Sequence, residues 1–277
     1  MPAVTFALAL IIFGSGVAAG GTGALLGIGG AVFVVPLLHI TLGFPLRTAA
    51  AIGLTTVIAT SSSVSAHRSG QQLINLRLGM VLEVATVAGS LLGGLIAHLL
   101  SETTLQRLFG IVTLLAAVAV LARVNRRNVI LDSSIDPGLL GGRFHDEESG
   151  GTVTYRVKRL PVALAASFVA GNVSSLLGVG GGVLKVPALN TWCGIPLRAA
   201  AATSAFTIGV TATSAAIIYY GRGDLPALAA APAVLGVQLG SWAGLRLTDR
   251  IPAKRLKVLL VVVLLVVAAL MFVRSVR

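Results

Sequence analysis

Charged side chains are scarce in this sequence, at 11% of its 277 residues, whereas a typical soluble domain carries about 25%. Hydrophobic residues make up 56% of the chain, and several apolar stretches approach the roughly 20 residues that a helix needs to cross a bilayer. Examples are 4–26, 78–100 and 256–273. The composition therefore predicts an all-α, polytopic helical protein that passes several times through the cell membrane, with the lipid bilayer as its surroundings.

Acidic residues are also few, nine against 21 Lys and Arg, which leaves a net charge of +12. In a soluble protein this excess would indicate nucleic-acid binding. Here the basic residues fall mostly between apolar segments, as the positive-inside rule expects, and no basic stripe is interleaved with aromatic residues. No nucleic-acid partner is expected.

Catalytic and redox motifs are missing from the sequence. The single cysteine, Cys193, excludes an internal disulfide and a CxxC site. There is no GxxxxGK[ST] loop for nucleotide phosphates, no HExxH and no GxSxG elbow. We therefore expect no enzyme activity, no cofactor and no metal site.

An internal repeat organises the chain. Shifting the sequence by 151 positions aligns it with itself, and 18 of the 37 positions from Gly20 to Thr56 are identical in the second copy without a gap. The repeat predicts three parts: a first transmembrane repeat at 1–123, a cytoplasmic polar loop at 124–159 and a second transmembrane repeat at 160–277.

Each copy contains five apolar units. They span 4–26, 31–42, 48–66, 77–99 and 105–122 in the first copy, and 160–178, 183–193, 199–218, 226–245 and 256–273 in the second. The second unit of each copy is too short to cross a bilayer alone, which predicts a half-helix or a re-entrant segment. Glycines precede this unit, and Pro36 or Pro187 lies within it, so we expect a helix break at these prolines.

Basic residues in the loops favour inverted halves over parallel ones. With inverted halves and an outside N-terminus, the loops 67–77, 123–159, 194–198 and 246–257 are cytoplasmic and hold 15 basic residues, against five outside. The best parallel arrangement leaves 12 inside and eight outside. Whether the short segments span or return stays open.

The glycine runs are the strongest candidate for a binding site. Consecutive glycines ahead of a helix bring backbone N–H groups together without side chains, which suits an anion, and transporters often aim such helix ends at a substrate near the membrane midplane. One buried cation beside them would add to the attraction, because charges inside a membrane tend to mark substrate pathways. The candidate substrate-binding residues are Gly27, Gly29, Gly30, Gly178, Gly180, Gly181, Gly182 and Lys185. The alternatives are glycines that only allow close helix packing and a lysine that reaches the interface.

Five further polar residues could act in gating or coupling. Arg47 and Arg198 occupy matched places after a Pro turn, and interface anchoring is the alternative role. Glu83 could relay a proton or pair with the buried lysine, or be a structural carboxylate. His39 and Asn190 are matched by the repeat within the short segment, where a buried structural histidine is the commoner outcome.

The polar loop between the halves contains one further pattern. "TVTYRV" alternates as a strand does, and "DEESGG" before it is typical of a turn, which predicts a small hairpin. His145 lies beside Asp146, Glu147 and Glu148, and a metal or regulatory site is one interpretation. A solvated turn is the favoured one.

The paired stretches "LLGIGGAVFVVPLL" and "LLGVGGGVLKVPAL", each followed by a "GxPLRxAAA" turn, resemble the signatures of the TauE/SafE sulfite exporter family. The resemblance covers nearly the whole chain. It implies a permease for sulfite or small organosulfonates, usually exporting them. In this sequence Ala31 and Val34 stand where the second copy has Gly182 and Lys185, so any site is asymmetric.

The residues and the resemblance together predict a secondary transporter for a small sulfur-containing oxyanion, with protons as one candidate coupling ion. Two alternatives stay open: an importer of thiosulfate or another sulfur anion, which could use the Cys193 thiol, and a carrier of an unrelated small solute. A cation-coupled carrier would need clustered membrane carboxylates, and only Glu83 is available. A homodimer is kept open as a further partner.

Overall fold

The computed structural model describes residues 5–26, 29–68, 73–121, 136–146, 151–248 and 253–276. The first half forms α1 (Phe6–Leu26), α2 (Ala31–Pro36), the π-helical segment η1 (Leu37–Thr41), α3 (Leu46–Arg68), α4 (Leu76–Ala97) and α5 (Glu102–Leu121). The second half forms α6 (Leu160–Leu177), α7 (Gly182–Trp192), α8 (Leu197–Gly221), α9 (Ala227–Thr248) and α10 (Ala253–Val276). Six of these helices, α1, α3, α4, α6, α8 and α9, are long and apolar enough to cross a membrane. The predicted polytopic helical architecture is confirmed.

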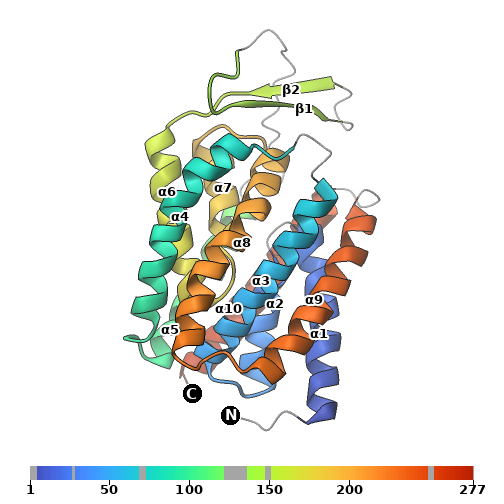
Figure 1. The fold of residues 1–277 in the computed structure, drawn as a ribbon, viewed down its shortest axis with the longest axis vertical. Helices are drawn as coiled ribbons and strands as arrows, with labels where there is room; N and C mark the ends of the chain where they lie inside the picture. Colours follow the sequence, from blue (N-terminus) through green and yellow to red (C-terminus); the bar gives the residue numbers. More distant parts are fainter. Residues whose placement is uncertain are drawn as a thin grey trace.

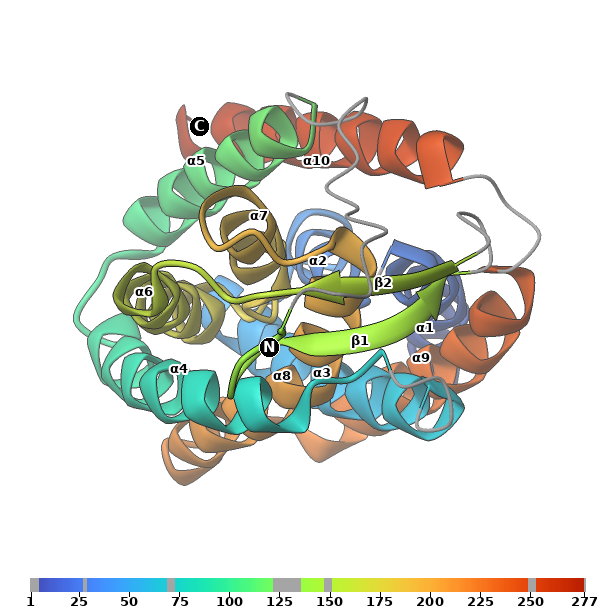
Figure 2. The same ribbon diagram turned by 90° about the horizontal axis from the view of Figure 1, so that it is seen from above.

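The helices of one half pack mainly on those of the other half. The most extensive pairs are α1 with α9, α4 with α6, α5 with α10 and α3 with α8. The offset of 151 residues exchanges α1 with α6 and α4 with α9, so the first two pairs are equivalent interfaces. Figure 2 shows α3 and α8 in the middle of the bundle, with α5 and α10 side by side at its edge.

Glycines allow the two equivalent interfaces to form at very short backbone separation. A Cβ atom added to Gly240 of α9 would lie 2.0 Å from the carbonyl oxygen of Val17 in α1. A Cβ added to Gly89 of α4 would lie 2.0 Å from the carbonyl oxygen of Phe168 in α6. Gly89 and Gly240 are matched by the repeat, as are Val17 and Phe168, so the same contact is made twice.

The hairpin predicted in the polar loop is confirmed. β1 (Gly142–Asp146) pairs antiparallel with β2 (Gly151–Tyr155). It lies across one end of the bundle, while both chain termini are at the other end (Figure 1). Asn75, at the start of α4, donates hydrogen bonds from Nδ2 to Leu140 O (2.8 Å) and to the Tyr155 hydroxyl (3.1 Å), which fixes the hairpin to the bundle. His145 is exposed on β1, and Glu147 and Glu148 lie outside the described residues.

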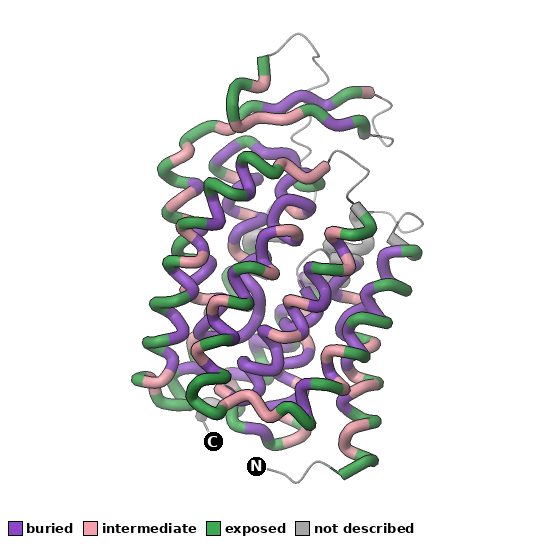
Figure 3. Tube along the Cα trace, viewed as in Figure 1, coloured by how far each residue is buried: buried purple, intermediate pink, exposed green. Residues whose placement is uncertain are grey.

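Large apolar side chains face outward from the bundle, which is expected of a protein whose solvent is lipid. Val84 on α4, Val210 on α8 and Leu235 on α9 are all more than half exposed. The central helices α3 and α8 are buried along most of their length (Figure 3), and many of their buried side chains are hydroxyls. Apolar side chains therefore cover the outside of the bundle, while its interior combines a hydrophobic core with buried hydroxyl groups.

The prolines do not break the short helices, contrary to the expectation for Pro36 and Pro187. Pro187 lies inside α7, which continues to Trp192. Pro36 is the last residue of α2, and helical structure continues beyond it as the π-helical segment η1, so the loss of one N–H donor does not end the helix. The chain instead changes direction at the glycines that precede α2 and α7.

Candidate functional site

The glycines before α2 and α7 form two turns with left-handed backbone conformations. Gly29 has φ of 82°, and Gly178 and Gly180 have φ of 71° and 72°, values that favour glycine strongly. The helices that follow have Gly30 and Gly181 as N-caps, with no side chain capping either one. The first N–H groups of a helix have no partner within that helix, so both turns present backbone donors. Gly27 lies outside the described residues.

These two turns approach each other at the centre of the bundle. A Cβ added to Gly29 would lie 3.6 Å from Cγ2 of Val57 and 3.9 Å from Cδ1 of Ile208, and one added to Gly180 would lie 3.0 Å from Cγ2 of Val57. Val57 is the middle residue of α3, and Ile208, its counterpart in the repeat, is next to the middle of α8. Both side chains are buried. The two turns therefore lie about halfway along α3 and α8, with the apolar side chains of Val57 and Ile208 between them.

Lys185 is fully buried in the first turns of α7, and its ammonium group is surrounded by acceptors. Nζ donates to Thr207 Oγ1 on α8 (3.0 Å) and to Thr86 Oγ1 on α4 (3.1 Å), and it lies 3.5 Å from Oε2 of Glu83 on α4. Three hydrogen-bond donors thus face three acceptors from two neighbouring helices. Because Lys185 N bonds to Gly181 O (2.9 Å), the lysine belongs to the same helical turn as the second glycine run.

Glu83 is held from its other side by a hydroxyl. Thr211 of α8 donates a hydrogen bond to Glu83 Oε1, one helical turn after Thr207. The helices that surround the pair, α4, α6, α7 and α8, carry only two other charged residues, Arg77 and Arg198, and these lie at the first turns of α4 and α8. Lys185 and Glu83 are therefore the charged groups at this depth of these four helices, and they compensate each other.

The equivalent place in the first half is apolar. The repeat matches Lys185 with Val34, Glu83 with Val234 and Thr86 with Val237. The threonines remain as Thr56 and Thr60, but their hydroxyls bond to the carbonyl oxygens of Gly53 (2.7 Å) and Thr56 (2.8 Å) within their own helix. The same helices thus pack in one half with valines at the positions that Lys185 and Glu83 occupy in the other half. The packing itself therefore does not require the ion pair.

Three buried serine hydroxyls on α6 and α8 have no hydrogen-bond partner among the described residues. Ser174 and Ser175 lie in the last turn of α6, directly before the glycines, and Ser204 lies on α8 one turn before Thr207. A buried hydroxyl without a partner costs free energy on the order of 1–3 kcal/mol. Such groups are available to a ligand that brings acceptors.

His39 and Asn190 close the same loop in the two halves. Nδ1 of His39 lies 2.8 Å from Phe44 O, and Nδ2 of Asn190 donates to Ile195 O at 2.8 Å. Phe44 and Ile195 are matched by the repeat. Nε2 of His39 also contacts Gln106 on α5 at 2.9 Å. The structure brings neither side chain to Lys185. The bond that each makes, to the carbonyl oxygen five residues later, holds its own loop in place.

Arg47 and Arg198 have different surroundings. Arg47 donates from Nη2 to Leu100 O (2.6 Å) and from Nε to Ala97 O (3.3 Å), and so bonds to the end of α4 and the loop after it. Arg198 is exposed at the start of α8. Cys193 is fully buried at the end of α7.

The geometry adds three residues that reasoning from the sequence missed. Thr86 completes the lysine site, and Val57 with Ile208 separates the glycine turns. Thr86 lies three residues after Glu83, on the same face of a helix, which is a usable signal. The two apolar residues are matched by the repeat but have no distinctive chemistry that would have marked them.

Comparisons with known proteins agree with the architecture. A family model described as "Sulfite exporter TauE/SafE" matches residues 12–271. The chain is 26% identical over 259 residues to the "Probable membrane transporter protein YunE" of Bacillus subtilis (strain 168), covering 91% of this chain and 93% of that protein. No solved structure matches the chain. With its multi-pass helical bundle and a family match over nearly its full length, the chain belongs to the TauE/SafE family of membrane transporters.

Proposed function

We propose that the protein is a secondary transporter that exports a small sulfur-containing oxyanion, such as sulfite or an organosulfonate. The observation that carries this proposal is that two glycine turns, neither with a side-chain cap, approach each other at the middle of the bundle. The second of them leads directly into the first turns of α7, which hold Lys185. Backbone N–H groups and an ammonium group are the donors that a compact oxyanion requires. The unpaired hydroxyls of Ser174 and Ser204 would add donors from α6 and α8.

An inverted repeat gives this site its position in the membrane. In Figure 1, α1 begins at the end that holds the chain termini, whereas its counterpart α6 begins at the end that holds the hairpin. This supports two repeats, at 1–123 and 160–277, that run in opposite directions, with the loop at 124–159 in the cytoplasm. In such a pair, the two short helices enter from opposite faces and point their N-termini at one place near the midplane.

The ion pair between Lys185 and Glu83 supplies a coupling mechanism. In this structure the carboxylate of Glu83 occupies one of the three acceptor positions around Nζ. A substrate oxyanion would compete with it for that position, and a buried carboxylate left without its cation is costly. Protonation of Glu83 removes this cost. Anion binding at Lys185 is thus linked to proton uptake at Glu83, because the negative charge of the anion replaces that of the carboxylate.

The threonines make this exchange feasible without exposing a bare charge. Thr86 and Thr207 hold Nζ by themselves at 3.1 and 3.0 Å, so the ammonium group stays solvated while its third partner changes. Thr211 donates a hydrogen bond to the other oxygen of Glu83. When Glu83 is protonated, the same hydroxyl can accept a hydrogen bond from the carboxylic acid, since a hydroxyl both donates and accepts.

Flux of radiolabelled sulfite in proteoliposomes, with and without an imposed pH gradient, tests the proposal. We expect flux that rises when the gradient drives protons in the same direction as the anion, because the two bind together. Lys185→Met should lower the flux by about tenfold or more, the equivalent of losing a charge-assisted hydrogen bond of roughly 1.5–3 kcal/mol. Glu83→Gln should keep the flux but remove its response to the gradient. Arg107→Gln, which removes an exposed cation from α5, is the matched control and should leave both unchanged.

Two results would count against the proposal. Flux of the wild type that ignores the gradient would exclude proton coupling through Glu83. Absence of flux for sulfite, and then for a panel of organosulfonates and thiosulfate, would exclude the substrate class while leaving the architecture in place.

A further inference from the structure

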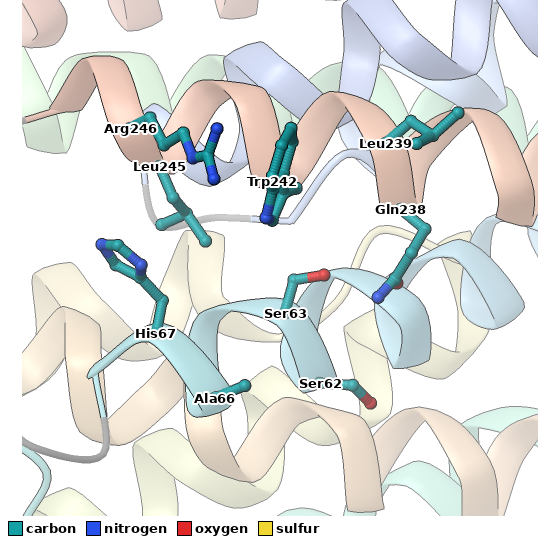
Figure 4. Close-up of a pocket in the computed structure, with 9 residues that line it drawn as sticks. All are labelled: Ser62, Ser63, Ala66, His67, Gln238, Leu239, Trp242, Leu245 and Arg246. Carbon is teal, nitrogen blue, oxygen red and sulfur yellow. The ribbon is translucent and has the colours of Figure 1, made fainter.

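A groove of about 590 Å³ lies between α3 and α9, away from the glycine turns. Its walls combine apolar side chains with a few polar ones near the end of the bundle that holds the hairpin (Figures 1 and 4). The residues that line it are Ser62, Ser63, Ala66, His67, Gln238, Leu239, Trp242, Leu245 and Arg246. We propose that this groove binds the headgroup of an anionic phospholipid.

The cation of the groove is Arg246, in the last turn of α9. Its guanidinium carbon lies 3.5 Å from the centre of the Trp242 ring, a stacking contact that orients the planar group. No carboxylate among the described residues forms an ion pair with Arg246. A stacked guanidinium that keeps its hydrogen-bond donors available matches the geometry of a phosphate group.

Further polar groups come from α3, on the opposite wall. Figure 4 shows His67 and Ser63 pointing toward α9, across from Leu245 and Trp242. The Oγ atom of Ser63 is buried and has no hydrogen-bond partner among the described residues, although Ser62 beside it bonds to Ile58 O at 3.0 Å. A hydroxyl without a partner, an imidazole and a guanidinium thus belong to the lining of one groove, from two helices.

The apolar part of the groove indicates that the ligand is a lipid and not a free anion. Below Trp242, the exposed residues Leu239, Leu235 and Leu228 follow one another on the outer face of α9 toward its start. Such a row suits an acyl chain that hangs from the headgroup into the bilayer. Tryptophan and arginine at the end of a membrane helix are typical of the level of the lipid headgroups.

The internal repeat shows that the fold does not require these residues. The equivalent seam, between α8 and α4, has Ile218 in place of His67, Leu91 in place of Trp242 and Leu95 in place of Arg246. That seam is also filled: a Cβ added to Gly94, the counterpart of Leu245, would lie 2.9 Å from Cδ1 of Ile218. One copy of the seam is therefore closed and apolar, and the other is open and basic.

Tryptophan fluorescence gives a direct test, because the chain has only two tryptophans. Trp192→Phe leaves Trp242 as the reporter. This variant is reconstituted in phosphatidylcholine vesicles that contain a fixed fraction of brominated lipid, which quenches tryptophan on contact. We expect brominated phosphatidylglycerol to occupy the groove with about a fivefold preference over brominated phosphatidylcholine, as one basic residue near the headgroups provides.

Variants separate a headgroup site from ordinary surrounding lipid. Arg246→Gln should remove the preference, and Arg246→Lys should keep part of it, because the charge remains without the fork of donors. Arg77→Gln removes an exposed cation from the same end of the bundle and should leave the preference unchanged. Equal quenching by the two lipids in the Trp192→Phe protein would overturn the proposal. Displacement of the brominated lipid by inorganic phosphate would also overturn it, since the groove would then be a site for free anions.

Discussion

Nζ of Lys185 lies 3.5 Å from Oε2 of Glu83, although the two residues are 102 positions apart and belong to different halves of the chain. The internal repeat places valine at both equivalent positions, Val34 and Val234. The same helical framework therefore exists once with an ion pair and once without it. This relationship makes the pair a candidate for function and also provides the control for testing it.

Removing one member of the pair should destabilise the protein more than removing both. Lys185→Val leaves the Glu83 carboxylate buried without a cation, and breaking a buried pair costs about 3–5 kcal/mol. The double variant Lys185→Val/Glu83→Val copies the first half of the chain and should recover most of that loss. Equilibrium unfolding in mixed micelles measures both. A double variant as unstable as the single one would mean that the pair is required by the fold.

Gly180→Ala should be strongly destabilising and should abolish transport. The new Cβ would lie 3.0 Å from Cγ2 of Val57, at a backbone φ of 72° that side chains disfavour. Each effect alone costs on the order of 1 kcal/mol or more. Adding Val57→Ala should relieve the contact but not the backbone strain, and so recover only part of the thermal stability. Gly14→Ala, where nothing lies within 4 Å of the new Cβ, is the control and should not destabilise the protein, because alanine is favoured over glycine inside a helix.

His39 should be replaceable by the residue that its counterpart uses. His39→Asn can restore the bond to Phe44 O, as Asn190 bonds to Ile195 O, and should keep the fold and the flux with a smaller loss of stability, from the lost contact with Gln106. His39→Leu leaves that buried carbonyl without its partner and should cost about 1–3 kcal/mol. If His39→Asn folds normally but loses the response of flux to a pH gradient, His39 takes part in coupling and its role is not structural alone.

His98, just after α4, should make stability depend on pH. Burial lowers the pKa of His98, and so does the charge of Arg222 and of Arg47, although Asp224, 3.5 Å from Nδ1, opposes this. The unfolded chain therefore binds a proton at a higher pH than the folded protein does. Stability from this residue is present above the ordinary pKa of 6.5 and is lost as the pH falls through it.

The midpoint of thermal unfolding should accordingly decrease between about pH 7.5 and about pH 5.5. His98→Gln should flatten this part of the curve. An unchanged slope in His98→Gln would assign the pH dependence to other groups.

Most of the helices could be anticipated because their signal is local. The expected unit at 77–99 corresponds to Leu76–Ala97, and the unit at 160–178 to Leu160–Leu177. The hairpin was likewise predictable from strand alternation next to a turn. The continuation of the helices past Pro36 and Pro187 was not, because a proline removes one hydrogen-bond donor from a helix and the packing of neighbouring segments decides whether the helix continues.

The candidate site was only half visible in the sequence. The glycine runs and Lys185 stood out by composition and by the repeat. Thr86, Thr207 and Thr211 became part of the site only because α4 and α8 pack against α7 at that depth. Partners of this kind depend on the relative rotation of three helices, which no single segment encodes.

By itself, the sequence determined that the chain is a membrane protein, that it is a duplication and where its helices lie, because hydropathy and repetition are properties of neighbouring residues. The tertiary structure decided which buried charges meet, that the two glycine turns converge on Val57 and Ile208, and that only one of two equivalent seams is open. These outcomes follow from the packing of segments more than 100 residues apart, where a glycine in place of a leucine sets how closely two helices approach.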